Sequence, residues 1–198
     1  MMELKKILDC DVQMQHEGAL LIIESLPQYY ALFEGHGRSI PSIVNEMFSL
    51  LGSSVSETMV LTQFKAGTDD TVAGVMASIP GPKLMAANLI DLRHLLASVP
   101  IAQQEDVKGK VVSFGGQVPP VDKEIYYLSR IAVRQDLYGS GVADDLLDAF
   151  TERNPGFPVL GLHVKRDNTR ALSFYRRHGY KPSGDQLHGY LFLQKPSN

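Results

Sequence analysis

The sequence predicts an α/β fold, and three observations predict it. The first quarter of the chain has helical patterning, two β-like runs follow at 57–64 and 71–79, and strands alternate with helices from residue 124 onward. Such a pattern is typical of a sheet covered by helices. With 198 residues, 44% of them hydrophobic, the chain is long enough to bury one sizeable core. A single domain over 1–198 is therefore expected.

The N-terminal quarter is predicted to be mainly helical after a short first strand. Its expected elements are a strand at 4–8 and helices at 12–26, 27–34 and 41–52. Asp11 precedes the first helix, and Ser39 or Ser42 is the N-cap of the third, because these side chains accept hydrogen bonds from free amides of the first turn. Gly52 is expected to close the third helix.

A hairpin is predicted after these helices. The runs 57–64 and 71–79 are joined across 65–70, a polar segment with glycine, so the two strands should pair antiparallel.

The region 83–123 is predicted to be an inserted helix followed by a loop. Over 82–99, apolar residues alternate four and three positions apart, which places one stripe on a helix, and we expect that stripe to face the core. Its members are Met85, Leu89, Leu92, Leu96 and Val99. The stretch 102–122 is rich in Gly, Pro, Gln and charge and is expected to be a long exposed connection.

The C-terminal part is predicted to alternate between strands and helices. The run 124–133 is apolar on both faces, which is typical of an interior strand. A helix from Val142 to the Asn-Pro-Gly at 154–156 follows, then a strand at 157–164, a helix at 169–179 capped by Asn168, and a pair of strands within 180–194. The first of these helices should turn an apolar face inward: Val142, Ala143, Leu146, Leu147 and Phe150.

Gly139 and Gly141 stand directly before the helix that begins at Val142. Glycine there costs stability relative to alanine, so its placement indicates a turn or the close approach of a ligand. A strand, a glycine loop and a helix N-terminus together make an anion site, with phosphate as the natural guest. A P-loop is excluded because no Gly-Lys-Ser/Thr follows, and a dinucleotide fingerprint would need a third glycine where Asp144 stands.

At this loop the chain resembles the GCN5-related N-acetyltransferases (the GNAT superfamily), whose acetyl-CoA loop reads Arg/Gln-x-x-Gly-x-Gly/Ala. The six positions are taken by Tyr138, Gly139, Ser140, Gly141, Val142 and Ala143. Tyr138 departs from the usual Arg or Gln, which puts that side chain's phosphate contact in doubt. A second signature, with Asn, Ala, Tyr and Gly followed by an aromatic residue, is matched by Asn168, Ala171, Tyr175, Gly179 and Tyr180. The resemblance is specific over 124–194.

The resemblance implies a mixed, mostly antiparallel sheet with helices on both faces and with the fourth and fifth strands splayed apart. It implies that acetyl-CoA is the co-substrate, with its pantetheine arm paired to the backbone of Ile131, Ala132 and Val133. A backbone N–H of that segment would stabilise the oxyanion. The diphosphate would bind amides from Tyr138 to Ala143. Asn168 is included among the cofactor-binding residues, although capping its helix is the simpler role.

The resemblance also assigns catalytic roles. Tyr175 is the candidate general acid, because a phenol with a pKa of about 10 stays protonated at neutral pH. The alternative is a tyrosine of the core. Many relatives have a glutamate where Tyr127 aligns, so Tyr127 is included among the catalytic candidates. The general base itself is left open among a neighbour such as Glu124, another residue, and a chain of water molecules.

Composition narrows the partners and the compartment. A net charge of −3 and a pI near 6.1 argue against nucleic acid. The single cysteine, Cys10, cannot form an intrachain disulfide, so a cytoplasmic location is expected and Cys10 is treated as structural. None of the six histidines are spaced as i and i+4, so no metal is expected. Neither a signal peptide nor a membrane span is supported by the sequence.

The function expected from these features is transfer of acetyl from acetyl-CoA to a primary amine of a small molecule. The alternatives are acetylation of a protein N-terminus or lysine, and a CoA-binding sensor without catalysis.

The acceptor is expected between the N-terminal helices, the loop 35–39 and the region 83–123. A homodimer is one candidate oligomeric state. The arginines near 166–181 form either a solvated helix face or a contact to CoA phosphate, and Asp144 and Asp145 should point away from the loop.

Overall fold

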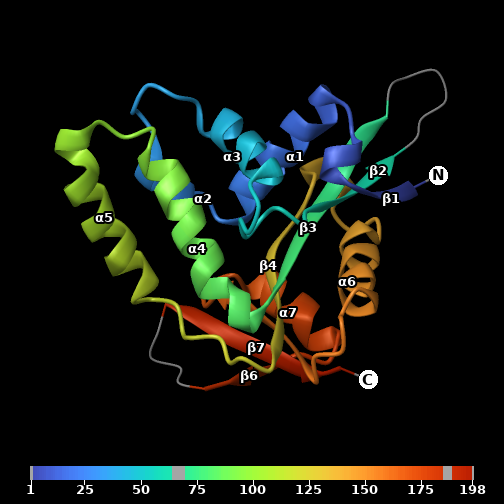
Figure 1. Ribbon diagram of the computed structural model, residues 1–198. Coiled ribbons are helices and arrows are strands. Elements are labelled where there is room, and N and C mark those ends of the chain that lie inside the picture. The colour runs from blue at the N-terminus through green and yellow to red at the C-terminus, as the bar shows by residue number, and fades with distance from the viewer. Residues whose placement is uncertain (1, 64–69, 185–188, 198) are drawn as a thin grey trace.

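A twisted seven-stranded sheet forms the centre of the molecule in the computed structural model, which describes residues 2–63, 70–184 and 189–197 (Figure 1). The strands are β1 (Met2–Lys6), β2 (Met59–Gln63), β3 (Thr71–Pro80), β4 (Ile125–Val133), β5 (Val159–Lys165), β6 (Lys181–Ser183) and β7 (Tyr190–Pro196). Their order in the sheet is β1-β2-β3-β4-β5-β7-β6. Among the strand pairs of the described residues, only β4–β5 is parallel, so the mixed, mostly antiparallel sheet is confirmed.

Helices cover both faces of the sheet, as predicted. They are α1 (Val12–Ser25), α2 (Pro27–Tyr30), α3 (Ile40–Ser49), α4 (Gly81–Leu96), α5 (Ile101–Gly115), α6 (Val142–Glu152) and α7 (Thr169–Arg177). One core cluster joins the sheet to the N-terminal helices, and another joins its opposite face to α6 and α7. No helix in the described ranges combines the length and apolarity needed to cross a bilayer.

Two of the expected N-caps lie where the sequence placed them. The Asp11 carboxylate accepts a hydrogen bond from the Met14 amide at 2.8 Å, and Ser39 accepts one from the Ser42 amide, so Ser39 caps α3. The predicted hairpin strands pair antiparallel as β2 and β3. Most of the connection predicted at 65–70 lies outside the described residues.

The expectation of a long connection at 102–122 was wrong, because most of it is the helix α5. Its sequence is polar, and Val107 is its one buried residue in the described chain. Gln104 ties the helix to the end of α4, since its side-chain amide donates to the carbonyls of Leu96 at 3.1 Å and Val99 at 3.0 Å. Few apolar residues and two glycines, Gly109 and Gly115, hid this helix from a periodicity analysis.

The expected core stripe of α4 was wrong at its N-terminal end. The side chains of Met85 and Leu89 are 75% and 60% exposed, and the buried face is centred instead on Ala87, Asp91 and Leu95. The Asp91 carboxylate accepts hydrogen bonds from the Ser54 amide at 3.2 Å and from the Ser54 hydroxyl. A buried, hydrogen-bonded aspartate therefore rotates the helix away from the orientation that its leucines suggest.

Strand β4 changes partners along its length. It pairs with β5 only from Ile125 to Leu128, and beyond that point the two strands separate, which confirms the predicted splay. On its other edge, Ala77 of β3 pairs with Arg130 and Ser78 pairs with Leu128, so Ser129 is an extra residue that forms a bulge. The C-terminal end of β4 therefore has a free edge towards β5.

Candidate functional site

A turn with unused amides connects β4 to α6. The N–H groups of Tyr138 and Ser140 donate within the turn, to the carbonyls of Gln135 and Leu137 at 3.2 Å each. Five other N–H groups have no protein acceptor among the described residues: those of Gly139, Gly141, Val142, Ala143 and Asp144. Such groups at a helix N-terminus, with the positive end of its dipole, bind anions. We refer to these five amides as the amide cradle.

The two glycines of the amide cradle adopt conformations that other residues avoid. Gly139 has φ of 82° and Gly141 has φ of 93°, and no atom lies within 4 Å of a Cβ built on either one. The glycines are therefore required by the backbone conformation and not by crowding within the protein. The space beside them is open for a ligand.

Tyr138, where related sequences have Arg or Gln, faces a cation. The guanidinium carbon of Arg170, at the start of α7, lies 3.9 Å from the centre of the Tyr138 ring, a cation–π arrangement. The Tyr138 side chain is 51% exposed. Arg134, just after β4, is instead neutralised by Asp136, which accepts from its Nε at 2.6 Å. Arg170 thus brings positive charge next to the turn.

Nearby polar residues have partners that turn them away from the cradle. The Asp144 carboxylate lies 3.0 Å from His178 Nε2 at the end of α7. Asn168 accepts a hydrogen bond from the Ala171 amide at 3.0 Å and so caps α7. These contacts give both side chains a structural role.

The free edge of β4 presents two peptide groups. The Arg134 amide donates to Ala73 on β3 at 2.9 Å, and peptide groups alternate in direction along a strand. The N–H groups of Ile131 and Val133 therefore point to the opposite edge, which β5 has left. Ala132 pairs with Val75 and faces β3.

Tyr175 lies in the core between α7 and the sheet. Its ring packs against those of Phe174 and Tyr180, with centroids 5.2 and 5.8 Å away. Burial raises the pKa of its phenol well above the usual range, with a smaller contribution from the nearby Tyr127. Tyr175 is therefore a protonated phenol over the whole physiological range.

Tyr127 and Glu124 occupy different environments. The Tyr127 hydroxyl is 2.9 Å from His163 Nδ1 on β5, and burial raises the pKa of Tyr127 to about 12. The phenol is therefore protonated, and it donates to Nδ1 in the histidine tautomer that carries its proton on Nε2. Glu124 is exposed and precedes β4, about 13 Å along the strand from Leu128 at 3.3 Å per residue. The fold thus joins Tyr127 to His163 and leaves Glu124 at the far end of the strand.

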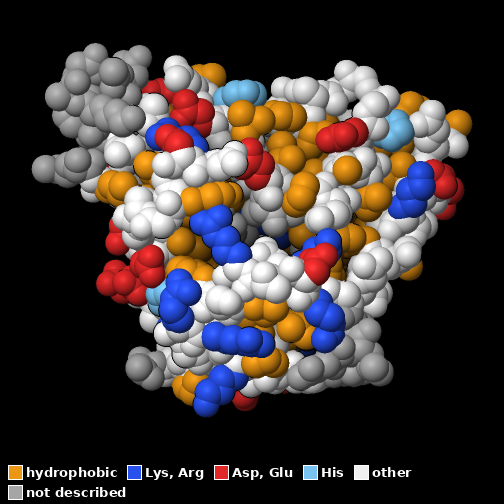
Figure 2. All heavy atoms as spheres, turned by 180° about the vertical axis from the view of Figure 1, so that it is seen from behind, with side chains coloured by type: hydrophobic (Ala, Val, Ile, Leu, Met, Phe, Trp, Pro, Cys, Tyr) orange, Lys and Arg blue, Asp and Glu red, His pale blue; other side chains and the backbone are white. Residues whose placement is uncertain are grey.

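Sequence analysis left the role of Arg170 undecided and could not identify the partner of His163, because the partners of both residues come from other elements. Each residue also fits its own segment without such a partner: Arg170 lies on the polar face of a helix, and His163 lies in a strand. In Figure 2, Lys and Arg side chains gather on the lower half of the back face, where α7 lies. The partners of the two residues, in contrast, are visible only in three dimensions.

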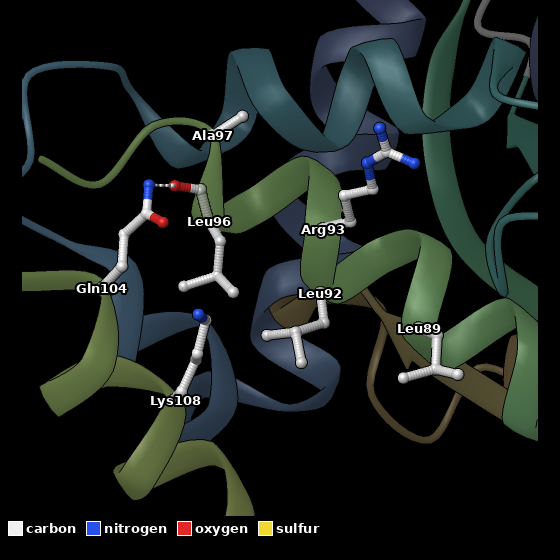
Figure 3. A pocket seen from close by; sticks show the side chains of 7 residues that line it. All are labelled: Leu89, Leu92, Arg93, Leu96, Ala97, Gln104 and Lys108. Atoms are coloured by element: carbon white, nitrogen blue, oxygen red, sulfur yellow. Dashed lines mark hydrogen bonds between the residues drawn. The ribbon is translucent and has the colours of Figure 1, made fainter. Parts of the chain in front are cut away.

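A separate pocket of about 410 Å³ lies between α4 and α5 (Figure 3). Its lining is Leu89, Leu92, Arg93, Leu96, Ala97, Gln104 and Lys108. Figure 1 shows these two helices on the opposite side of the molecule from α6. Within the described residues, no group of three or more His, Cys, Asp or Glu side chains is arranged to hold a metal ion.

Comparisons with known proteins agree with this geometry. Residues 97–182 match a family model described as "Acetyltransferase (GNAT) domain". A segment of 91 residues is 34% identical to a mycothiol acetyltransferase of Jonesia denitrificans, covering 45% of this chain and 28% of that protein. The chain thus spans only a small part of the length of that curated relative.

Solved structures show the same fold over nearly the whole chain. One, described as an acetyltransferase, has a TM-score of 0.66 at 20% identity and covers 99% of this chain and 100% of its own. Another, a chain of the NatC complex bound to Gag peptide and CoA, has a TM-score of 0.57 at 14% identity, with coverage of 100% and 99%. The chain therefore has the fold of these solved acetyltransferases, and its residues 97–182 match the GNAT acetyltransferase domain.

Proposed function

We propose that this protein transfers the acetyl group of acetyl-CoA to a primary amine of a small molecule. The observation that carries the proposal is the amide cradle placed directly beside the free edge of β4. The cradle suits a diphosphate, and the strand edge suits the amides of a pantetheine arm. Both parts of CoA are therefore matched by backbone groups of adjacent elements.

The cradle amides and Arg170 hold the diphosphate in this mechanism. The N–H of Ile131 or Val133 donates to the thioester carbonyl and stabilises the negative charge that develops on its oxygen. Tyr175, kept protonated by burial, donates its proton to the departing thiolate.

Tyr127 and His163 serve the acceptor in the same mechanism. With its pKa raised to about 12, the Tyr127 phenol is protonated and cannot act as a base alone. It can accept the proton of the attacking amine while passing its own proton to His163 Nδ1, 2.9 Å away. This relay replaces the carboxylate that many relatives have on β4.

Two other functions remain as alternatives. The likeness to a chain of the NatC complex, whose structure holds a peptide as well as CoA, favours a protein acceptor. The absence of a β4 carboxylate at Tyr127 favours a CoA-binding sensor without turnover.

A titration and an activity assay together test the proposal. Calorimetry with CoA should show binding, and acetyl-CoA with a panel of small amines should release thiol. Tyr175→Phe should lower kcat by about 100-fold without weakening CoA binding, because one general acid is worth this much.

Tyr180→Phe is the matched control for Tyr175→Phe. It removes a buried hydroxyl, without a hydrogen-bond partner in the described structure, from the ring packed against Tyr175. Its kcat should stay at the wild-type value. CoA binding without thiol release on any small amine would favour the sensor or a protein acceptor over the proposal.

A further inference from the structure

An arginine lies on the helix α2 side of the sheet at the point where β4 and β5 separate. The bulge at Ser129 reverses the alternation of side chains along β4. Leu128 packs in the cluster with α6 and α7, whereas the Arg130 guanidinium carbon lies 6.0 Å from the centre of the Tyr30 ring. The bulge therefore puts Arg130 on the same face as Tyr127 and His163.

Arg130 has no carboxylate partner among the residues that the structure describes. Its Nη1 donates to the Ser129 carbonyl at 2.7 Å, and its buried Nε has no acceptor. The nearby Asp91 is held by the amide and hydroxyl of Ser54. Because a guanidinium is always charged and has five donors, an unpaired one in this setting attracts an anion. The residue as a whole is half-buried, and its Nε is covered by protein.

The surroundings of Arg130 are aromatic and contain a second unused polar group. Tyr30 is 1% exposed, and its hydroxyl lies beside the Arg130 guanidinium without a hydrogen bond of good geometry in the described part of the chain. The Tyr29 ring contacts those of Tyr30 and of Phe114 on α5, at 5.4 and 5.7 Å between centroids, and Phe114 lies 5.8 Å from Tyr190. The surroundings of Arg130 therefore combine one cation with an apolar wall.

We propose that Arg130 and Tyr30 bind the carboxylate of the acceptor, which is then a free amino acid or a closely related amino carboxylate. The inference rests on the proposed acetyl transfer. Arg130 directly precedes Ile131, whose N–H faces the edge assigned to the thioester, so the amine and the anion of the acceptor are only a few atoms apart. A carboxylate fits one planar guanidinium, whereas phosphate sites usually gather more cations. A peptide N-terminus or a lysine side chain has no such carboxylate.

A panel of matched acceptors tests this subsite. Thiol release is measured with the proteinogenic L-amino acids, with their amides and with the corresponding decarboxylated amines. The wild type should favour the free acids in kcat/KM by at least about 30-fold, since losing one partner of a buried charge pair costs this much or more. Aminoalkyl phosphates in the same panel should be poor acceptors, and acceptance of them in place of the acids would overturn the carboxylate assignment.

Arg130→Gln should remove the preference by raising the KM for the acids, while the KM for acetyl-CoA and the rate with decarboxylated amines stay unchanged. Arg93→Gln, which removes an exposed guanidinium from α4, should leave every parameter as in the wild type. Tyr30→Phe should lose about 5-fold in kcat/KM for the acids only. Selectivity that survives Arg130→Gln would overturn the assignment.

Binding without turnover separates this inference from the proposed function. N-acetyl amino acids are titrated into wild-type and Arg130→Gln protein saturated with CoA. Binding to the wild type alone supports the subsite even if no amine is acetylated. Failure of CoA itself to bind would overturn the proposed function and with it the subsite. Normal CoA binding with no affinity for the N-acetyl amino acids would overturn the subsite alone.

Discussion

The turn before α6 and the α4–α5 pair both expose groups that a folded protein usually covers, but of different kinds. The turn leaves backbone amides unpaired at two left-handed glycines, whereas α4 exposes the apolar side chains of Met85 and Leu89. Unpaired amides at a helix N-terminus indicate one ligand chemistry, an anion. Exposed leucine and methionine indicate none in particular. In this protein, the backbone geometry of the turn therefore identifies the chemical class of a ligand, whereas the exposed apolar side chains of α4 do not.

The largest effect is expected inside α4. Asp91→Ala should lower the free energy of unfolding by about 3 kcal/mol, because it leaves the amide and the hydroxyl of buried Ser54 without their charged acceptor. Urea unfolding measures the change. Asp106→Ala, which removes an exposed ion pair with Lys110 from α5, should cost about 0.5 kcal/mol or less. Equal losses would mean that the polar contact does not orient α4.

An intermediate effect is expected at the turn. Gly141→Ala should cost about 1–2 kcal/mol of stability, because a Cβ disfavours the left-handed conformation. It should also weaken CoA binding about 10-fold, equivalent to 1.4 kcal/mol, by placing a methyl group in the cradle. Calorimetric titration and urea unfolding separate the two losses.

Gly156→Ala is the matched control for the turn. Gly156 has φ of 101°, and like Gly141 it has open space where a Cβ would stand, but it lies beyond the other end of α6. The control should lose similar stability and keep wild-type affinity for CoA. Weakened CoA binding in both variants would show that general destabilisation, and not the cradle, governs affinity.

The smallest effect is expected at the arginine that faces Tyr138. Arg170→Ala should raise the Kd for CoA about 5-fold at low ionic strength, because it removes an exposed cation beside the cradle. The loss should shrink at high salt, where exposed charges are screened. Arg177→Ala, at the other end of α7, should change the Kd little. A loss independent of salt would assign Arg170 a packing role against the Tyr138 ring.

The sequence was most informative where a local rule leaves few solutions. Gly139 and Gly141 before a strongly amphipathic helix indicated a bare backbone, and both have the positive φ values that this reading requires. Strand β4 was recognisable because it is apolar on both faces. These features depend on neighbouring residues only, so one stretch of sequence contains the whole signal.

The features that the sequence did not predict depend on contacts between distant segments. The hydrogen bond of Asp91 to Ser54 joins residues 37 positions apart, and no periodicity analysis includes a buried aspartate in a core stripe. Gln104 stabilises α5 by capping the end of another helix. Arg130 and Tyr30 approach each other only because Ser129 forms a bulge in β4. A bulge has no signature in a run such as Ile125–Val133.

The extra residue in β4 also limits how this chain can evolve. If β4 kept all of its residues but paired with β3 without the bulge, the two faces of the strand end would be exchanged, turning Arg130 into the apolar cluster with α6 and Ile131 towards the acceptor. The bulge must therefore be kept. A related protein that acts on a different acceptor would therefore change by substitution among the aromatic residues around Arg130, at Tyr29, Tyr30 or Phe114. Substitutions there leave the peptide groups assigned to the cofactor undisturbed.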